Sequence, residues 1–288
     1  MQEPQLIRVL ALATLSFTVA MAVTPAWSSI LYHLRLGKRI RYSGVAPVFA
    51  KLHQHKAGTP TMGGVLVWGT TFLLCIAFAA AAKLQPEVFG RFNFLSRSQT
   101  LLPLGALVAT AVVGLVDDVV DVVSRHGGGL KMLHRLLIYT GIAIVGAYWF
   151  YVKLGWTQLH VPFVGDLDIG AWYIPFFIVV IVATAFSVNE IDGLDGLAGG
   201  TLLAAYGTYG VIAFLLGRYD LATFCAVIVG ALLAFLWFNI PPARFFMGDT
   251  GAMSLGVTLG IIALLTNYAL LLPIIGVSGL IALIVQYQ

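Results

Sequence analysis

Residues 220–239 read DLATFCAVIVGALLAFLWFN, and apart from Asp220 at its start this run carries no charged side chain. A helix needs about 20 predominantly apolar residues to cross the hydrocarbon core of a bilayer. The run does not alternate between apolar and polar residues, as the strand of a membrane barrel would. The stretch therefore predicts a transmembrane helix.

Apolar runs of similar length recur along the chain. They lie at 6–31, 62–82, 99–120, 132–152, 171–189, 197–217 and 251–271, and a shorter run lies at 273–285. Since only helices and closed barrels satisfy all backbone groups in lipid, we predict an all-α polytopic transmembrane bundle of eight full spans and a partial ninth. We assign residues 1–288 to one integral membrane domain. The segment 153–170 contains short alternation and Gly-Asp turns, which predict a small exterior hairpin or surface loop.

The composition excludes most other classes of protein. Of the 288 residues, 60% are hydrophobic and 10% are charged, against about 25% charged in an ordinary soluble domain. So few charges could not cover the surface of a soluble globule, which excludes a cytosolic enzyme, a disordered chain and a DNA-binding domain. Cys75 and Cys225 both lie in apolar runs, so we interpret them as structural thiols and not as a disulfide framework.

Basic residues predict the orientation of the bundle. The loops on one side hold ten of them, namely Arg35, Lys38, Arg39, Arg41, Lys51, Lys56, Arg125, Lys131, Arg135 and Arg244. The loops on the other side hold five, Lys83, Arg91, Arg97, Lys153 and Arg218, and Arg8 near the N-terminus makes six. The positive-inside rule then places the first side in the cytoplasm and the N-terminus outside.

Most acidic residues gather on that same predicted cytoplasmic side. Seven of the twelve lie in three stretches near span ends: Asp117, Asp118, Asp121, Glu190, Asp192, Asp195 and Asp249. Acids at the ends of membrane helices are costly unless they are paired or hydrated, so we interpret them as functional. Two alternatives stay open. The acids could be ordinary interfacial groups facing water, or the acidic vestibule of a transporter, whose acids should lie near the midplane or line a pore.

The first acidic stretch, GLVDD at 114–118, ends a predicted span. Adjacent residues of a helix point about 100° apart, so Asp117 and Asp118 should meet different partners. The second stretch is NEIDGLDGLAGG at 189–200. Asp192 and Asp195 would share a helical face, and the glycines would let a ligand approach the backbone. The alternative is a helix–turn–helix punctuated by glycine, with Asp192 as an N-cap.

The third acidic stretch, NIPPARFFMGDTG at 239–251, contains a proline pair that should end one span before Asp249 opens the next. Asp249 could bind a ligand or only cap its helix. Phe246 could stack on a nucleobase or only anchor the helix at the interface. A fourth stretch, KAGTPTMGG at 56–64, suits phosphate contacts without Walker A spacing, and its alternative is a basic interfacial loop.

Carboxylates and a few basic groups on one face predict a site for Mg²⁺ and phosphate, because Mg²⁺ takes one or two carboxylates and substrate oxygens. In their order along the chain, the four stretches resemble the polyprenyl-phosphate N-acetylhexosamine-1-phosphate transferase family. GLVDD, NEIDGLDGLAGG and FFMGDTGAMSLG resemble the whole family, and KAGTPTMGG resembles its muramoyl branch. The resemblance covers about residues 45–286.

The resemblance implies ten transmembrane helices, a cytoplasmic active-site cleft and a bacterial inner-membrane location. It implies that undecaprenyl phosphate attacks the β-phosphate of UDP-MurNAc-pentapeptide, with Mg²⁺, to give lipid I and UMP for peptidoglycan synthesis. By motif, the catalytic acids are Asp117, Asp118, Asp192 and Asp249, of which Asp249 would bind the metal. The matched substrate-binding positions are Lys56, Thr61, Asn189, Gly193, Leu194, Asp195, Asn239 and Phe246.

This sequence departs from the family pattern at three places. Asp121 stands where the muramoyl branch usually has lysine, Glu190 is unusual beside Asn189, and the sequence stops at Gln288. We therefore expect a chain that lacks the His-rich cytoplasmic loop and the final helix of the family. A sibling transferase that uses UDP-GlcNAc, and a homodimer, stay open as alternatives. For the chemistry we predict direct attack with Asp117 nearest the lipid phosphate, and a covalent aspartyl intermediate is the rival scheme.

Overall fold

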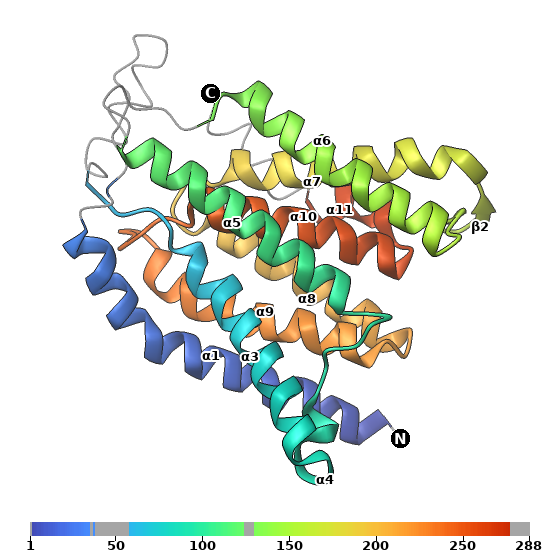
Figure 1. The fold of residues 1–288 in the computed structure, drawn as a ribbon, viewed down its shortest axis with the longest axis horizontal. Coiled ribbons are helices and arrows are strands. Elements are labelled where there is room, and N and C mark those ends of the chain that lie inside the picture. The colour runs from blue at the N-terminus through green and yellow to red at the C-terminus, as the bar shows by residue number, and fades with distance from the viewer. Residues whose placement is uncertain (1, 35–36, 38–57, 124–129, 277–288) are drawn as a thin grey trace.

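The computed structural model describes residues 2–34, 37, 58–123 and 130–276. In this part of the chain, long helices run roughly parallel and antiparallel to one another in a single bundle (Figure 1). The long helices are α1 (Gln2–His33), α3 (Gly64–Leu84), α5 (Leu101–Val123), α6 (Met132–Tyr148), α7 (Tyr173–Ile191), α8 (Leu197–Leu215), α9 (Tyr219–Asn239) and α10 (Gly248–Thr266). The short helices are α4 (Pro86–Phe89) and α11 (Leu272–Ile275), with η2 (Gly90–Phe92), η3 (Trp149–Lys153), η4 (Gly170–Trp172) and η5 (Ala269–Leu271).

The architecture confirms an all-α, multi-pass membrane protein. Within the described residues, seven helices are long and apolar enough to cross a membrane. They include the run at 220–239, which becomes α9 almost residue for residue. Helix α5 has 23 residues but is not among the seven, and it ends in an acidic stretch. The count of eight full spans therefore stays a prediction, and most of the partial ninth lies outside the described residues.

Helix α10 forms the centre of the bundle, since every residue from Gly248 to Thr266 is buried. A helix that is apolar all round is buried on all sides, and small residues let its neighbours approach closely. A Cβ on Gly256 would lie 2.9 Å from the Cα of Ala185 in α7, and one on Gly260 would lie 2.9 Å from the Ile181 side chain. The backbone of α7 is thereby held directly against α10.

Proline and asparagine set the ends of the last two long helices. Helix α9 ends at Asn239, just before Pro241 and Pro242, as the proline pair predicts. Helix α10 then begins at Gly248, which confirms the prediction that Asp249 lies at a helix start. The predicted span 251–271 was too long, because Asn267 adopts φ 64° and ends α10 in a left-handed cap.

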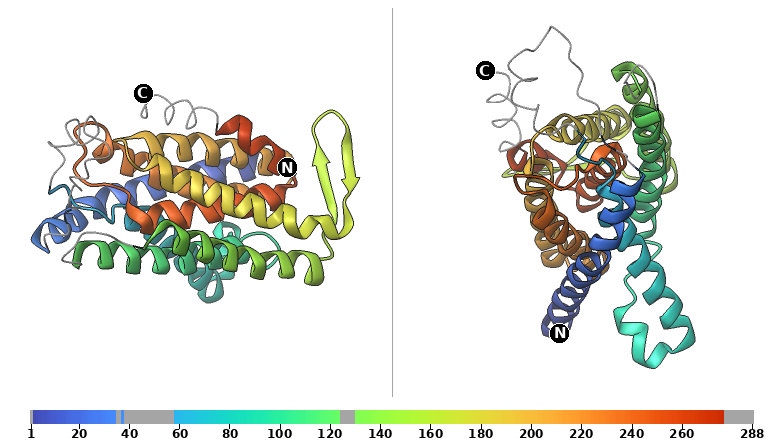
Figure 2. Two further views of the ribbon diagram at one scale, coloured as in Figure 1. Left: turned by 90° about the horizontal axis from the view of Figure 1, so that it is seen from above. Right: turned by 90° about the vertical axis from the view of Figure 1, so that its left-hand side faces the viewer.

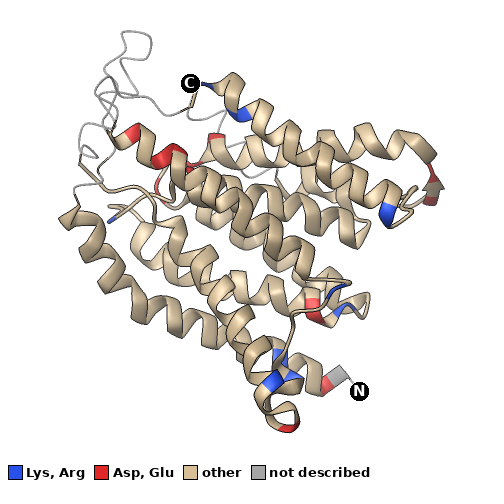
Figure 3. Ribbon diagram, in the orientation of Figure 1, with Lys and Arg blue, Asp and Glu red and all other residues tan. Residues whose placement is uncertain are grey.

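The segment between α6 and α7 forms the predicted hairpin. Strands β1 (Gln158–Val161) and β2 (Gly165–Asp168) pair antiparallel, with Leu159 opposite Leu167. The hairpin projects beyond the helices in Figure 2, at the end of the bundle away from the acidic end of α5 (Figure 3). One end of the bundle therefore carries the acids of α5, and the opposite end carries the hairpin. The acids of the second half of α5 lie where α10 begins.

Away from the acidic end, packing and an ion pair between α1 and α9 stabilise the part of the bundle that the structure describes. Cys75 and Cys225 are free and buried, and their interpretation as structural thiols stays a prediction. Arg8 of α1 contacts Asp220 of α9 at 2.6 Å, and both side chains are largely shielded from solvent. This pair joins α1 to α9.

Candidate active site

One arginine and two aspartates from three helices meet at the acidic end of the bundle. The Arg135 Nη2 group of α6 lies 2.9 Å from Asp117 Oδ2 of α5 and donates a 2.8 Å hydrogen bond to Asp249 Oδ2 of α10. Its Nη1 group donates to Asn189 Oδ1 of α7 at 2.8 Å. The Asn189 amide in turn donates to Asp249 Oδ1 at 2.5 Å. Four helices are thus joined through four side chains, which we call the Arg135 cluster.

Asp118 points away from this cluster and caps the start of α10. Its Oδ1 accepts the backbone N–H of Asp249 at 3.1 Å, and its Oδ2 accepts that of Thr250 at 2.9 Å. The Thr61 hydroxyl also donates to Asp118 Oδ1 at 3.2 Å. Carboxylates satisfy the unpaired N–H groups of a helix start and complement its dipole. The adjacent aspartates therefore meet different partners, as their helical spacing predicts.

Two glycines allow α5, the start of α10 and the segment before α3 to approach one another closely. Gly248 adopts φ +75°, and a Cβ there would lie 2.5 Å from the Thr61 hydroxyl and 2.6 Å from Asp118 Oδ2. A Cβ on Gly114 of α5 would lie 2.4 Å from the backbone oxygen of Asp249. At Gly248, only glycine can adopt the left-handed conformation and also leave room for these neighbours. At Gly114, a side chain would collide with the backbone of α10. The positions of both aspartates thus depend on the absence of side chains beside them.

The stretch after α7 is a turn and not a continued helix. Asp192 is the C-cap of α7, and α8 begins after Gly196, which has φ 78°. The alternative of a helix–turn–helix punctuated by glycine is therefore confirmed, but its N-cap role for Asp192 is wrong, because Asp192 is the C-cap of α7. Asp192 and Asp195 do not share a helical face either, because Asp192 accepts the N–H of Gly248 at 2.9 Å, whereas Asp195 accepts that of Ala243 at 3.2 Å.

Asn239 joins this turn to the loop before α10. Its Oδ1 accepts the N–H of Gly196 at 2.9 Å, and its Nδ2 donates to the Phe245 oxygen at 2.8 Å. Phe246 is half-buried and donates its N–H to the Pro60 oxygen at 2.8 Å. The loop before α10 is therefore held by the turn after α7 on one side and by the segment that leads into α3 on the other.

The structure sorts the predicted site residues into two groups. Asp117, Asp249 and Asn189 contact one another through Arg135. The residues that frame this cluster through backbone contacts are Asp118, Asp192, Asp195 and Asn239, and the Thr61 hydroxyl donates to the Asp118 side chain. Gly193 and Leu194 lie half-buried in the turn after α7. Lys56 lies outside the described residues.

Sequence reasoning missed the central role of Arg135, which it counted only as a loop cation. A signal was present, because Arg135 begins the apolar run of α6 and an ionisable residue inside a membrane helix is a functional candidate. Tyr139, one turn further along α6, is fully buried beside the cluster. Among the described residues its hydroxyl has no hydrogen-bond partner. Both side chains direct polar groups toward the acids.

The family resemblance implies Mg²⁺, and the donor set at the cluster fits it. Among the described residues no group of three or more His, Cys, Asp or Glu is arranged to hold a metal. Mg²⁺ does not need such a cage, since it binds one or two carboxylates and completes its shell with water and phosphate. Asp117 Oδ2 is buried against Arg135 Nη2 at 2.9 Å, and Arg135 and Asn189 hold the Asp249 carboxylate nearby. Asp117 and Asp249 thus offer hard oxygen ligands.

The profile of glycosyl transferase family 4 matches residues 100–267, which include all three acidic stretches. The first signature of phospho-N-acetylmuramoyl-pentapeptide-transferases matches residues 56–66. With the multi-pass bundle and its buried acids, the first match defines a membrane-embedded glycosyl-1-phosphate transferase.

Curated relatives give the narrower family. The chain is 38% identical over 279 residues to the phospho-N-acetylmuramoyl-pentapeptide-transferase of Chloroflexus aurantiacus, covering 94% of this chain and 71% of the relative. It is 38% identical over 277 residues to that of Geobacillus kaustophilus, covering 95% and 79%. It is 35% identical over 267 residues to that of Clostridium kluyveri, covering 91% and 77%. The chain therefore belongs to the phospho-N-acetylmuramoyl-pentapeptide-transferase family.

Proposed function

We propose that this protein transfers phospho-MurNAc-pentapeptide from UDP-MurNAc-pentapeptide to undecaprenyl phosphate, releasing UMP and forming lipid I. The observation that carries the proposal is the contact of Asp117 and Asp249 with one cation, Arg135, at one end of a membrane bundle. Phosphoryl transfer requires mainly positioning and charge neutralisation, which such a cluster supplies. Membership of the family provides the substrate classes.

We propose Mg²⁺ as the cofactor, held by Asp117 and Asp249. When bound there, Mg²⁺ would neutralise the diphosphate and the departing UMP. We assign Asp118 a positioning role, because its oxygens already accept the N–H groups of Asp249 and Thr250. Asp192 also supports the start of α10, through the N–H of Gly248. The proposal therefore divides the four acids into two ligands and two supports.

For the chemistry we propose direct attack. An oxygen of the lipid phosphate forms a bond to the β-phosphorus, and the bond from that phosphorus to the bridging oxygen of UMP breaks. The acceptor phosphate has a second pKa of about 6, so it is already mostly a dianion at neutral pH and need not give a proton to Asp117. Asp117, whose Oδ1 accepts the N–H of Leu130, orients the acceptor as a metal ligand. Asn189 and Arg135 hold Asp249 in place meanwhile. Detection of a phosphorylated aspartate after incubation with the donor alone would contradict this scheme.

We propose that the Arg135 cluster faces the cytoplasm of a bacterial inner membrane and that the N-terminus lies outside. The support is the excess of basic loop residues on the side of the acids. Most of those basic residues precede α3, outside the described residues. A cytoplasmic site also matches the cytoplasmic origin of a sugar nucleotide.

The test is turnover by the purified protein in detergent with undecaprenyl phosphate and Mg²⁺. UDP-MurNAc-pentapeptide and UDP-GlcNAc are offered in parallel, and UMP and the lipid product are measured. The proposal expects product only from the peptide-bearing donor. Product from UDP-GlcNAc alone would identify the sibling transferase, which Asp121 favours as a departure from the muramoyl pattern. Uptake of donor into proteoliposomes without any acceptor would instead indicate a transporter.

A further inference from the structure

Tyr139 of α6 is fully buried, and its hydroxyl has no hydrogen-bond partner among the described residues. Burying an unpaired hydroxyl lowers the stability of a folded protein. Other buried tyrosines of the bundle avoid this loss. The Tyr206 hydroxyl donates to the Leu255 oxygen at 2.7 Å, and the Tyr209 hydroxyl donates to the Tyr268 oxygen at 3.0 Å. The unpaired hydroxyl of Tyr139 therefore calls for an explanation in the site beside it.

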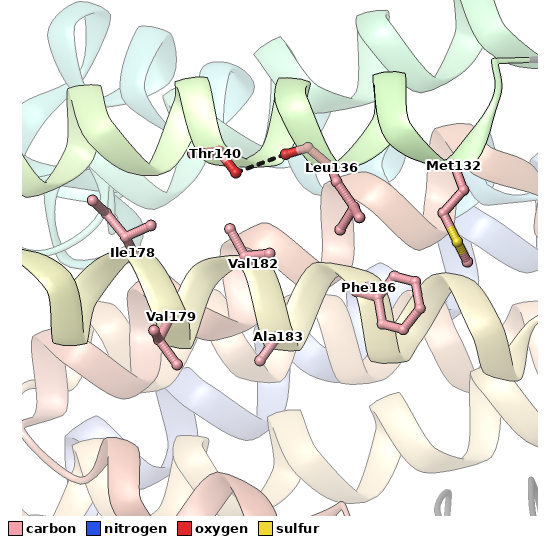
Figure 4. Close-up of a pocket in the computed structure, with 8 residues that line it drawn as sticks. All are labelled: Met132, Leu136, Thr140, Ile178, Val179, Val182, Ala183 and Phe186. Carbon is pink, nitrogen blue, oxygen red and sulfur yellow. Dashed lines mark hydrogen bonds between the residues drawn. The ribbon is translucent and has the colours of Figure 1, made fainter.

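Tyr139 lies on the face of α6 that is turned toward the acids. Residues i and i+4 of a helix share a face, so Tyr139 lies one turn beyond Arg135 on the same side. The adjacent face of α6 carries Leu136 and Thr140 and lines an apolar pocket between α6 and α7 (Figure 4). There the Thr140 hydroxyl donates to the Leu136 oxygen of its own helix at 2.8 Å. The hydroxyl of a tyrosine is too far from its own backbone for such a bond, so Tyr139 depends on a partner from another element.

The charged groups whose electric fields act on the Tyr139 hydroxyl are Asp249, Arg135, Asp117 and Glu190. A tyrosine hydroxyl can donate one hydrogen bond, and a carboxylate is a strong acceptor. At present Arg135 Nη2 serves two of these acids, with a 2.8 Å hydrogen bond to Asp249 and a 2.9 Å ion pair with Asp117. The contact with Asp117 lacks the alignment of a hydrogen bond. It therefore depends on charge, and another cation could replace it.

We propose that Tyr139 is a positioning residue for Asp117, and that its hydroxyl donates to the Asp117 carboxylate when a divalent ion replaces Arg135 as the counter-charge. This rests on the proposed function, which assigns the ion to Asp117 and Asp249. Arg135 keeps its hydrogen bonds to Asp249 and Asn189. Carboxylates that bind a metal are commonly hydrogen-bonded in turn, and these donors tune the affinity for the metal. Tyr139 thus supplies the contact to Asp117 that Arg135 gives up.

The test removes the hydroxyl in Tyr139→Phe and uses Tyr173→Phe as the matched control. Tyr173 is also buried, and its hydroxyl is likewise unpaired within the described part of the chain. It begins α7, at the opposite end of that helix from Asn189. In EDTA both variants should melt at or slightly above the wild-type temperature, because neither loses a hydrogen bond. Mn²⁺ binding, followed by electron paramagnetic resonance, should weaken about threefold or more in Tyr139→Phe and stay unchanged in Tyr173→Phe.

The outcomes separate this proposal from the proposed function. Equal Mn²⁺ affinity in wild type and Tyr139→Phe would overturn the role of Tyr139 and leave the metal site intact. A Tyr139→Phe protein that melts as far below wild type in EDTA as it does with Mn²⁺ would also overturn it, because the residue would then have an ordinary structural role. A wild-type protein that binds no Mn²⁺ would overturn the proposed metal site as well.

A double-mutant cycle tests the exchange between Arg135 and Tyr139 without any metal. In EDTA, Arg135→Leu removes the cation from Asp117, and the Tyr139 hydroxyl should then donate to that carboxylate. Tyr139→Phe should therefore lower the melting temperature of the Arg135→Leu protein, although it does not lower that of wild type. Equal effects of Tyr139→Phe in the two backgrounds would contradict the exchange. The Mn²⁺ comparison decides the proposal if the Arg135→Leu protein does not fold.

Discussion

Arg135 Nη2 lies 2.8 Å from Asp249 Oδ2, and the same nitrogen lies 2.9 Å from Asp117 Oδ2. One guanidinium therefore balances two carboxylates that are almost entirely buried. Buried like charges of this kind are stable only with a cation between them. Arg135 is that cation within the protein. A divalent ion bound to the same carboxylates would also neutralise part of their negative charge.

Removing Arg135 should therefore destabilise the protein and make it dependent on divalent ions. Arg135→Leu leaves two carboxylates without their counter-charge, which should cost about 2 kcal/mol or more. Mg²⁺ should raise the melting temperature of this variant more than that of wild type. Thermal unfolding in detergent with EDTA or with Mg²⁺ measures both effects. Arg97→Leu, at an exposed arginine elsewhere, is the control, and an identical response in the two variants would contradict the prediction.

Asp249→Asn should leave a folded protein with very low turnover. The amide keeps the shape of the side chain and can still accept from Arg135, but it removes a charge from the proposed metal site. Loss of such a preorganised electrostatic contact costs about a hundredfold or more in rate. Release of UMP, measured beside thermal unfolding, gives both quantities. Near-normal product formation would exclude Asp249 from the metal site.

We expect Asp118 to stabilise the start of α10 and not to bind the metal. Asp118→Ala removes the acceptor for the N–H groups of Asp249 and Thr250, which should cost about 1–2 kcal/mol of stability. Asp118→Asn retains a carbonyl acceptor and should lose less. The measurement is thermal unfolding of both variants. Equal stability of wild type and Asp118→Ala would show that the cap contributes nothing.

Gly248→Ala should disrupt the site by straining the backbone at the start of α10. Alanine at φ +75° is strained, and its Cβ would meet Thr61 and Asp118, so we expect a loss of about 2 kcal/mol or more and a large loss of turnover. Gly200→Ala in α8 is the matched control, because a Cβ there meets nothing within 4 Å. The control should be as stable as wild type or slightly more so. A stable, active Gly248→Ala protein would refute the close packing described here.

The orientation can be tested with single cysteines, since both native thiols are buried. Phe163, fully exposed in the hairpin, and Arg244, exposed in the loop before α10, lie toward opposite ends of the bundle. In intact cells, Phe163→Cys should react with a membrane-impermeant maleimide, whereas Arg244→Cys should react only after permeabilisation. The reverse pattern would place the acidic cluster outside the cytoplasm.

Hydropathy predicted the helical class and most helix boundaries because bilayer thickness fixes how long an apolar run must be. The Pro241–Pro242 pair likewise marked the end of α9. The end of α10 was missed, since apolar residues continue past Thr266 while Asn267 adopts a left-handed conformation. Hydropathy carries no information about such a cap.

The acidic stretches were identifiable from sequence, but their individual roles were not. Which way a carboxylate faces depends on how each helix is rotated in the bundle, and apolar runs on all sides do not reveal that rotation. The helical spacing predicted that Asp117 and Asp118 meet different partners, but not that Asp118 caps α10 and Asp117 contacts Arg135. Asp192 and Asp195 would have shared a face only in a continued helix, and the sequence did not decide between that helix and the glycine turn that the structure shows.

The most direct test of the account is binding of Mn²⁺, as a paramagnetic substitute for Mg²⁺, followed by electron paramagnetic resonance. The proposed site predicts that Asp117→Asn and Asp249→Asn each weaken Mn²⁺ binding by about tenfold or more, whereas Asp118→Asn binds nearly as well as wild type. Wild-type affinity in both Asp117→Asn and Asp249→Asn would contradict the claim that these two carboxylates share one divalent ion.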